Sequence, residues 1–281
     1  MKIAVTGASG FVGSHVLDAL GTRGDVEIVA SSRGPIAPER LPSNARHVAL
    51  DLGADVGGAY AALGRPDVLI HLAWGGLPNY LSLHHFETEL PAQYRFLRTM
   101  VEDGLPALVA TGTCYEYGMA SGSLAEEDGE PAGNPYAFAK TALLEQLTFL
   151  KAKQPFELTW ARLFYMYGER QAPTSIFPLL KAAVGRGEAV FPMSKGEQLR
   201  DYLPISAVAR HLVDLALRDK GVGVVNVCSG EPISIRALVE SWIATNDWTI
   251  VPELGRYPYP TYEPLAFWGN RTKLDQVLKA R

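Results

Sequence analysis

The chain has 281 residues, of which 47% are hydrophobic and 20% charged, and its formal net charge is -4. This is an ordinary globular composition, and the length suits one large domain or two small ones with a substantial buried core. The small negative charge and the absence of a Lys/Arg cluster argue against nucleic acid as a partner. The chain has two cysteines, no apolar signal segment before its first strand and no run of ~18 apolar residues, so we expect a cytoplasmic protein without a membrane partner.

Short apolar segments alternate with longer helical segments through the first half of the chain. The expected strands are residues 2–6, 26–30, 47–50, 67–72, 107–111 and 158–164. The expected helices are residues 11–20, 86–101 and 136–150. Continuous apolar strands that alternate with helices predict a parallel sheet covered on both faces, which is an α/β fold of the Rossmann-type, doubly wound class.

The second half of the chain is richer in proline and glycine from about Gly168 onward. Its expected elements are helices at residues 206–217 and 233–244 and a strand at residues 224–227. Residues 251–264 contain four prolines and are expected to be mostly irregular. We therefore expect a Rossmann domain over residues 1–165, to which a segment near residues 200–228 returns, and a smaller, loop-rich substrate-binding domain over residues 166–281.

A glycine-rich turn follows the first expected strand and opens the first expected helix. In this context Gly7 permits a tight turn, Gly10 lets the backbone approach a pyrophosphate, and Gly13 lets the helix pack close to the strand. Exposed backbone N–H groups and the helix dipole then attract phosphate groups. The other residues expected to contact the dinucleotide here are Ser9, Phe11 and Val12. The alternative is a strand–helix turn without a ligand.

The end of the second expected strand bears on the choice of dinucleotide. An acidic residue ~20 positions beyond the glycines would bind the ribose hydroxyls of NAD. This chain has Ser31, Ser32 and Arg33 there instead. A guanidinium pairs with a 2′-phosphate by charge and by geometry, so Ser32 and Arg33 favour NADP. The alternative is that Arg33 is a solvated loop residue.

Tyr136 and Lys140 lie one turn apart at the start of the third expected helix, so their side chains share one face. A free tyrosine has a pKa near ~10 and is a poor acid–base group at neutral pH. A nearby ammonium would lower that pKa, and Lys140 could also bind the cofactor ribose. Thr113 follows the fifth expected strand, where a hydroxyl can hydrogen-bond the same substrate oxygen. Alone, the Tyr–Lys pair could equally be an ordinary helix surface.

These residues together resemble the extended short-chain dehydrogenase/reductase family, which includes the NAD-dependent epimerases and dehydratases. The motifs that carry the resemblance are TGASGFVG at residues 6–13, DL at 51–52, HLAW at 71–74, TGTCYEYG at 111–118, NPYAFAK at 134–140, RLFYMYG at 162–168 and GEQLRDYL at 196–203. The resemblance implies Thr113, Tyr136 and Lys140 as catalytic residues. It further implies cofactor contacts from Asp51, Leu52, Leu72, Ala73, Trp74 and Phe164. Its implied substrate contacts are Thr113, Cys114, Tyr136 and Tyr165, with Arg200 and Arg256 as diphosphate ligands; no metal is expected.

Departures from the family pattern narrow the range of activities that we expect. Sugar dehydratases of the family have an Asp–Glu pair directly after the catalytic Thr, where this chain has Cys114 and Tyr115. Glu116 is one place out of register, and strand alternation would turn its side chain the other way. Elimination needs an acid and a base at those positions, so dehydration is disfavoured. Two asparagines common in the family are replaced, near Thr88 and by Tyr165.

The pattern most resembles bacterial reductases of 4-keto-6-deoxy nucleotide sugars, such as those acting on dTDP-4-dehydro-6-deoxyglucose. We therefore expect NADPH-dependent reduction of the C4 ketone of a nucleotide sugar, linked to dTDP, CDP or GDP, for surface polysaccharide synthesis. One alternative is a 4-epimerase with tightly bound NAD, and another is a non-catalytic dinucleotide-binding sensor. The resemblance also implies a homodimer through the helices at residues 86–101 and 136–150.

Overall fold

A sheet of seven parallel strands forms the centre of the molecule. The computed structural model describes residues 1–280, so that Arg281, the last residue of the expected substrate domain, lies outside the described part. The strand order is β11-β7-β5-β4-β1-β2-β3, and every neighbouring pair is parallel. The strands are β1 (Lys2–Thr6), β2 (Glu27–Ser32), β3 (Ala45–Ala49), β4 (Val68–His71), β5 (Ala107–Thr113), β7 (Glu157–Leu163) and β11 (Gly223–Val227). This architecture confirms the predicted Rossmann-type fold.

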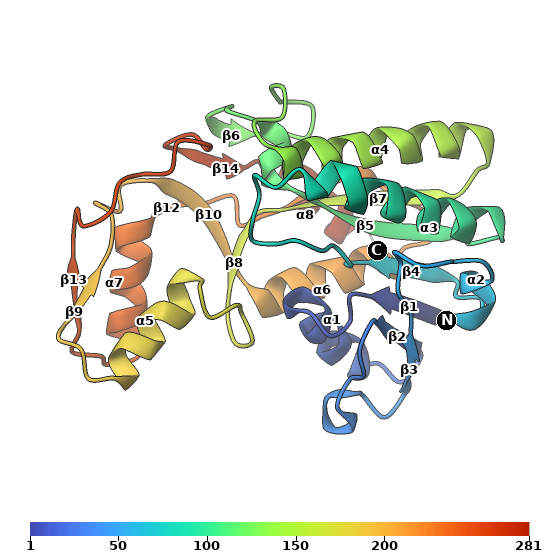
Figure 1. Ribbon diagram of the computed structural model, residues 1–281, viewed down its shortest axis with the longest axis horizontal. Coiled ribbons are helices and arrows are strands. Elements are labelled where there is room, and N and C mark those ends of the chain that lie inside the picture. The colour runs from blue at the N-terminus through green and yellow to red at the C-terminus, as the bar shows by residue number, and fades with distance from the viewer. Residues whose placement is uncertain (281) are drawn as a thin grey trace.

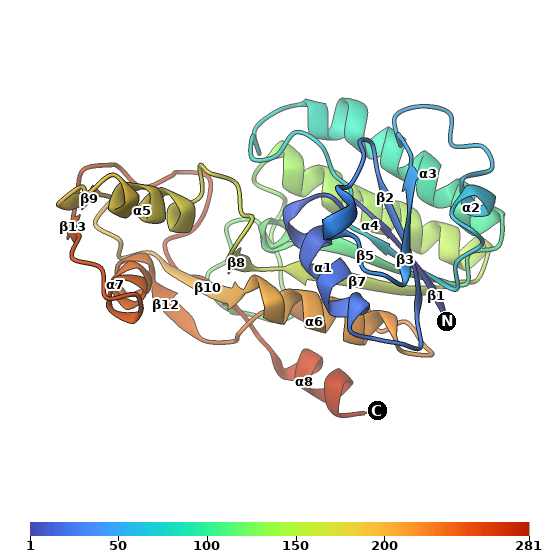
Figure 2. The ribbon, with the colours of Figure 1, turned by 90° about the horizontal axis from the view of Figure 1, so that it is seen from below.

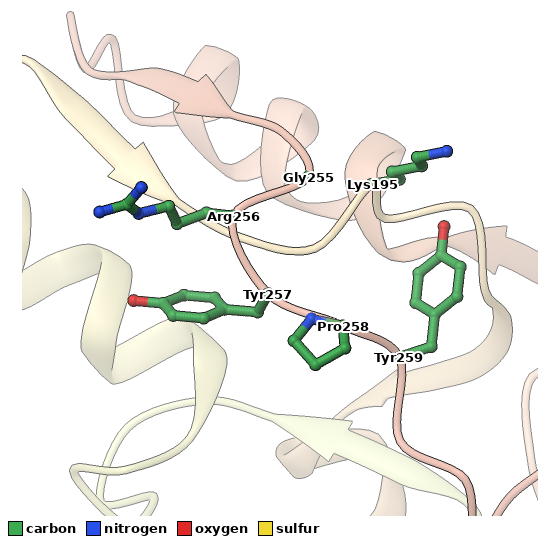
Figure 3. Close-up of a pocket in the computed structure, with 6 residues that line it drawn as sticks. All are labelled: Lys195, Gly255, Arg256, Tyr257, Pro258 and Tyr259. Atoms are coloured by element: carbon green, nitrogen blue, oxygen red, sulfur yellow. The ribbon is translucent and has the colours of Figure 1, made fainter.

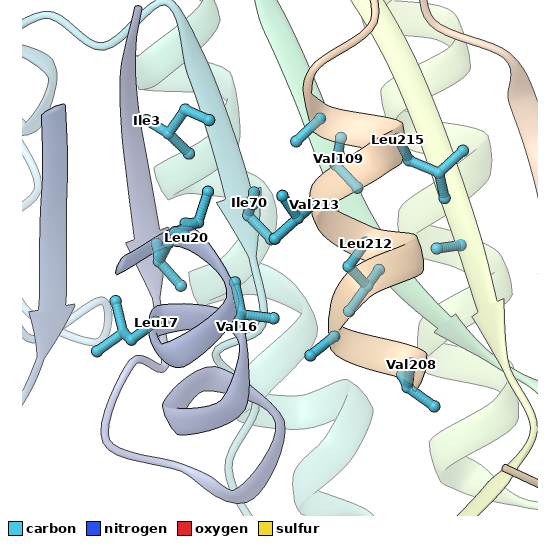
Figure 4. Packing of buried hydrophobic residues seen from close by; sticks show 14 of the residues in the cluster. Ile3, Val16, Leu17, Leu20, Ile70, Val109, Val208, Leu212, Val213 and Leu215 are labelled. Atoms are coloured by element: carbon cyan, nitrogen blue, oxygen red, sulfur yellow. The ribbon is translucent and has the colours of Figure 1, made fainter. Parts of the chain in front are cut away.

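Helices cover both faces of the sheet (Figure 1). One face carries α1 (Phe11–Gly21) and α6 (Ile205–Ala216), and the other carries α2 (Ala59–Ala62), α3 (Leu90–Glu102) and α4 (Pro135–Lys153). Alternate residues of β1 serve the two cores, since Ile3 packs on the α1 side and Ala4 on the α3 side. Figure 4 shows Val16 and Leu20 of α1 and Leu212 of α6 packed in the same core, on one face of the sheet.

The chain order of the strands reverses between β1 and β4. The carboxyl ends of these two strands therefore form the topological switch point, where open α/β sheets bind their ligands. The glycine turn lies at the end of β1, and Leu72 begins the segment that leaves β4.

The predicted helix at residues 86–101 differs from the helix in the structure. A π-helical turn, His85–Glu89, comes first, and α3 begins only at Leu90. Pro91 lies in the first turn of α3 and lacks the N–H that would continue a regular ladder from the preceding residues. A wider turn accommodates the proline ring, and such π turns are frequent at functional sites.

A smaller lobe lies beyond one end of the sheet (Figures 1 and 2). It contains α5 (Ile176–Gly185), α7 (Ile235–Thr245), β9 (Val190–Pro192) and β13 (Val251–Glu253), with a core that includes Phe191, Leu238 and Trp242. The parallel pair of β9 and β13 takes up residues 251–253, and residues 254–264 are irregular, so the segment is mostly irregular as expected. A three-stranded sheet joins the lobe to the body: β8 (Tyr165–Tyr167), β10 (Leu199–Pro204) and β12 (Pro232–Ser234).

The end of the chain crosses back from the lobe to the body. Residues 254–266, which we call the strap, connect β13 to β14 (Phe267–Gly269), and β14 pairs with β6 (Gly122–Leu124). The last helix, α8 (Thr272–Lys279), then packs against β11. Two 3-10 turns, η1 (Pro38–Arg40) and η3 (Cys114–Tyr117), complete the elements. Within residues 1–280 no helix combines the length and apolar character needed to cross a bilayer.

Candidate active site

The glycine turn has the geometry that its sequence predicts. Gly7 has a φ of +69°, and a Cβ there would lie 2.8 Å from the backbone of Leu72 and Ala73. A Cβ on Gly13 would lie 2.2 Å from the carbonyl oxygen of Gly7. Neither position can therefore accept a side chain without moving backbone. Ser9 is exposed at the apex of the turn, at the start of α1, where backbone N–H groups can face an anion.

A buried side-chain hydrogen bond links the ends of β1 and β4 beneath this turn. His71 Nδ1 lies 2.8 Å from Thr6 Oγ1, and both side chains are buried. Burial lowers the pKa of His71 to about 3, with the charge of Lys140 acting in the same direction. A histidine that stays neutral over the physiological range and bonds a neighbouring strand is structural rather than a proton donor.

Tyr136 and Lys140 are positioned by the start of α4. Asn134 caps this helix, because its Oδ1 accepts the Ala137 N–H at 2.9 Å, and Pro135 occupies the first turn. The Lys140 ammonium donates to the Thr111 carbonyl of β5 at 2.9 Å. The structure thus ties α4 to the strand that ends at Thr113.

Aromatic side chains enclose Tyr136. The centroid of its ring lies 5.9 Å from that of Trp74, 5.6 Å from that of Tyr80 and 5.2 Å from that of His85. Trp74 also lies beneath the Lys140 ammonium, with 3.9 Å between Nζ and the ring centroid. Trp74 was expected as a cofactor contact, whereas Tyr80 and His85 were not expected in the site, because their loop has no recognisable motif.

Burial controls the ionisation of the pair. Burial raises the pKa of Tyr136 above its usual value, and a contact with the Thr113 side chain opposes the effect. Burial also lowers the pKa of Lys140 to about 7, against the attraction of the Glu116 and Glu89 carboxylates. The expected lowering of the phenol pKa by Lys140 is therefore not what the structure shows. Desolvation is the largest influence on the pKa of the Tyr136 phenol.

Thr113 is the last residue of β5, two residues beyond the expected strand end. Its Oγ1 accepts the Tyr115 N–H at 3.3 Å, and its own N–H donates to Glu116 at 2.8 Å. Glu116 also accepts from Trp160 Nε1 at 3.1 Å and pairs with Arg162 at 2.8 Å. Glu116 belongs to the η3 turn, so strand alternation does not apply to it as expected. Its buried carboxylate is committed to structural bonds on the interior side of Thr113.

A polar network forms another wall of the site. Tyr165 donates to Glu263, whose carboxylate also pairs with Arg200 at 3.0 Å between Nη2 and Oε1. The Tyr115 hydroxyl lies 3.2 Å from that of Tyr165 and 3.4 Å from Glu263. The Arg200 guanidinium also donates to the carbonyls of Leu199 at 2.8 Å and Leu265 at 3.0 Å.

Glu263 was not expected in the site. It lies in the strap, after three of the four prolines, where sequence periodicity gives no signal. Asp201, the neighbour of Arg200, accepts hydrogen bonds from the backbone N–H groups of Ser229 and Gly230. Tyr165 and Arg200 thus contact the same carboxylate, that of Glu263.

The remaining predicted residues lie around this centre. Ser32 Oγ donates to the Gly34 carbonyl at 2.7 Å, while Arg33 is exposed at the end of β2. Asp51 is exposed and bonds the Gly53 N–H at 3.0 Å, and Leu52 is buried in the α3-side core. The predicted residues Phe164 and Cys114 lie in a separate buried cluster of hydrophobic side chains.

Arg256 lies farther out, in the strap. It lines a pocket of about 530 Å³ with Lys195, Tyr257, Pro258 and Tyr259 (Figure 3). The Arg256 and Tyr257 side chains extend to the same side, and Tyr259 donates to Glu197 at 2.6 Å. Arg256 and Arg200 therefore belong to separate surroundings. Among residues 1–280, no group of three or more His, Cys, Asp or Glu side chains is placed to hold a metal ion.

The family follows from the whole of this pattern. A model of the family described as "NAD dependent epimerase/dehydratase family" matches residues 3–228. The chain belongs to this family. That membership confirms the resemblance seen in the motifs at both the glycine turn and the Tyr–Lys helix.

Individual relatives have similar lengths and folds. The dTDP-6-deoxy-L-talose 4-dehydrogenase (NAD(+)) of Aggregatibacter actinomycetemcomitans is 29% identical over 96% of this chain and 100% of its own. The dTDP-6-deoxy-L-talose 4-dehydrogenase (NAD(P)(+)) of Kitasatospora kifunensis is 27% identical over 92% of this chain and 83% of its own. The solved structure of MoeE5 in complex with UDP-glucuronic acid and NAD is 26% identical, with a TM-score of 0.83 over 99% of this chain and 93% of that chain.

Proposed function

We propose that this protein catalyses NADPH-dependent reduction of the C4 ketone of a 4-keto-6-deoxy nucleotide sugar. The observation that carries the proposal is the juxtaposition of Tyr136, Lys140 and Thr113 at the carboxyl end of β5, beside the glycine turn. Two relatives named as 4-dehydrogenases of dTDP-6-deoxy-L-talose support the class of substrate and the position of the reaction. A dTDP-linked sugar is therefore the first substrate to test.

In the proposed mechanism the protein supplies a proton and holds the ketone in place. When bound, the nicotinamide cofactor supplies the hydride. The buried Tyr136 phenol remains protonated, as a donor to the developing alkoxide requires. Thr113 Oγ1 keeps donor capacity, because the Tyr115 N–H uses it only as an acceptor, so it can orient the same oxygen. Lys140, anchored on the Thr111 carbonyl, binds the ribose and presents its charge beside Tyr136.

The hydrogen bonds and ion pair that engage Glu116 favour reduction over dehydration as the activity. Elimination requires an acid and a base next to the catalytic Thr. Cys114 is buried with a raised pKa, and the Glu116 carboxylate is engaged by Trp160 and Arg162. The side chains that follow Thr113 thus offer no free acid–base pair to the sugar.

We propose NADPH as the preferred cofactor on the strength of Arg33. Its exposed side chain at the end of β2 can reach a 2′-phosphate, and no acidic residue takes the place that NAD enzymes use at this strand end. The relative from Kitasatospora kifunensis is named with NAD(P)(+), which is compatible with this preference.

A 4-epimerase with tightly bound NAD is the second candidate, because one relative is named UDP-glucose 4-epimerase and the solved MoeE5 structure contains both UDP-glucuronic acid and NAD. An epimerase would copurify with NAD and interconvert sugars without added cofactor. A reductase consumes NADPH in equal amount to the ketone. Incubation of the purified protein with a dTDP-4-keto-6-deoxy sugar and NADPH, followed by NMR of the product, separates the two. A sensor would bind NADPH and oxidise none with any 4-keto sugar.

We also propose a homodimer in the cytoplasm. Phe138 and Phe149 of α4 are 53% and 75% exposed, and they lie about three helical turns apart on one side of the helix. Phe86 packs edge-on to Phe138 beside α3, which extends this apolar strip. The free cysteines Cys114 and Cys228 fit a reducing compartment.

A further inference from the structure

His85 lies directly behind the proposed acid–base pair, although no feature of its sequence marks it. The side chain is fully buried, and it opens the π-helical turn before α3. Its ring centroid lies 5.2 Å from that of Tyr136 and 6.4 Å from that of Trp74, nearly parallel to the indole at 28°. The hydrogen bonds of this buried histidine therefore affect the positions of both neighbouring aromatic rings, those of Tyr136 and Trp74.

The hydrogen bonds of His85 define its protonation. The Trp74 indole Nε1 can only donate, and it lies 3.1 Å from His85 Nδ1, so Nδ1 must be an unprotonated acceptor. His85 Nε2 lies 2.8 Å from the Asn79 carbonyl oxygen and therefore carries the ring proton. The imidazole is thus neutral, and both of its nitrogens are used. A doubly protonated ring would set two donors against each other at Trp74.

Trp74 transmits this constraint to the Tyr136–Lys140 pair. The Lys140 ammonium lies 3.9 Å from the centroid of the indole, within cation–π range, and the indole and Tyr136 rings pack edge-to-face at 74°. The other charged groups that act on Lys140 are Glu116 and Glu89, while burial favours its neutral form. Rotation of the indole would remove one of the few contacts that favour the ammonium.

We propose that His85 is a positioning residue for Tyr136 and Lys140, and that it acts through the Trp74 N–H. By accepting that hydrogen bond it holds the face of the indole against the Lys140 ammonium and keeps the indole in edge-to-face contact with the Tyr136 ring. The same imidazole binds the Asn79 carbonyl, so it also couples the loop after β4 to the proposed catalytic residues. This inference rests on the roles given above to Tyr136 and Lys140.

A set of variants separates the hydrogen bond from simple packing. His85→Phe keeps a planar ring but removes the acceptor, and we expect kcat to fall about tenfold with the KM for NADPH changed less than about twofold. His85→Asn places an amide oxygen near the position of Nδ1, and it should recover most of the lost turnover. Trp74→Phe should reproduce the His85→Phe loss. The double variant should be no slower than either single variant, because both remove one interaction.

A second readout does not depend on turnover. The titration of Lys140 can be followed by NMR in protein with 13C-labelled lysine, with Lys140→Met to assign the signal. The pKa of Lys140 should fall in His85→Phe and Trp74→Phe and return toward the wild-type value in His85→Asn. His211→Phe, at a half-buried histidine of α6 on the opposite face of the sheet from α4, is the matched control and should change neither kcat nor the titration.

These outcomes separate the inference from the function on which it rests. Near-normal turnover of Tyr136→Phe would remove the proposed catalytic role, while the Lys140 titration would still test the effect of His85. An unchanged Lys140 pKa in His85→Phe, or multiplicative losses in the double variant, would overturn the inference. A structural role alone predicts lower stability in His85→Phe, without recovery of the Lys140 pKa in His85→Asn.

Discussion

Individual residues at the carboxyl end of β5 carry the proposed chemistry. Tyr136 is buried among Trp74, Tyr80 and His85, and Thr113 and Lys140 both depend on β5 for their position. Sequence spacing predicts the Tyr–Lys pair because i and i+4 share a helix face. The aromatic enclosure could not be predicted, since it is assembled from the loop after β4 and the π-helical turn that precedes α3.

Tyr136→Phe removes the proton donor while keeping the ring. We expect turnover to fall by roughly 10²–10⁴-fold, as is typical when general acid catalysis is lost. NADPH binding, measured by fluorescence titration, should remain near the wild-type value because the ring still fills its place. Tyr94→Phe on α3 provides a control outside the site. Retention of most of the turnover by Tyr136→Phe would rule out its assigned role.

Arg33→Asp replaces the proposed 2′-phosphate ligand with a charge that repels phosphate. A hydrogen bond to a charged group contributes ~1.5–3 kcal/mol, so the NADPH-to-NADH ratio of kcat/KM should fall roughly 10–100-fold. Arg40→Asp, at an exposed position of η1, should leave that ratio unchanged. If Arg33→Asp and Arg40→Asp give the same ratio as the wild type, Arg33 does not select the cofactor.

The secondary-structure elements that show a simple hydrophobic pattern in the sequence were predicted well. The parallel sheet and α1, α4 and α6 follow from apolar runs and helical periodicity. The lobe was predicted less well, because its elements are short and are stabilised by contacts distant in sequence. The β9–β13 pair joins residues about sixty positions apart, and α5 contains Pro178, which is tolerated only because it lies in the first turn.

The packing of α1 on β1 depends on Gly13. A Cβ there would meet the Gly7 carbonyl oxygen at 2.2 Å and Ala8 Cα at 2.8 Å, both on backbone that cannot turn away. We expect Gly13→Ala to reduce the free energy of unfolding by ~1–3 kcal/mol, as overpacking does, and to weaken NADPH binding. Urea unfolding and fluorescence titration measure these effects. Gly24→Ala, where a Cβ meets nothing within 4 Å, is the control; equal stability of the two variants would contradict this account.

The strap is anchored to the body by Glu263. Its carboxylate balances the buried Arg200 guanidinium, and removal of one partner of a buried ion pair costs ~3–5 kcal/mol. We expect Glu263→Ala to lose stability of that order in urea unfolding and to raise the KM for the nucleotide sugar. Glu197→Ala removes an exposed carboxylate that bonds strap residue Tyr259 and should cost less than ~1 kcal/mol. A loss in Glu263→Ala no greater than that control would show that the pair does not anchor the strap.

The whole molecule places its site where the sheet, the lobe and the strap meet. The chain crosses between body and lobe more than once: α6 and β11 return to the body between the lobe elements β9 and α7, and α8 returns after β13. Local patterns cannot predict such a return for α8, since eight residues with one buried leucine resemble any short surface helix. β1 and β4 belong to the central sheet and also carry the site at their carboxyl ends. A loss of global stability therefore also disturbs the site.

The pH dependence of unfolding should report His71. The pKa of this histidine is about 3 in the folded protein, against 6.5 for an unperturbed histidine, with burial as the main cause. The unfolded chain therefore binds the proton first, so stability is complete above pH 6.5 and is lost as the pH falls toward 3. The full loss is on the order of 5 kcal/mol. Urea unfolding from pH 7 to 4 should show a shallower decline for His71→Asn; identical slopes would contradict the buried, neutral assignment.

The central claim is that this chain reduces a 4-keto nucleotide sugar with a proton from Tyr136. The most direct measurement combines NADPH consumption with NMR of the product when the wild type and Tyr136→Phe are given a dTDP-4-keto-6-deoxy sugar. We predict one NADPH oxidised for each C4 alcohol formed by the wild type, and almost none by Tyr136→Phe. Interconversion of sugars without NADPH consumption, or no product from any 4-keto nucleotide sugar despite tight NADPH binding, would contradict the claim.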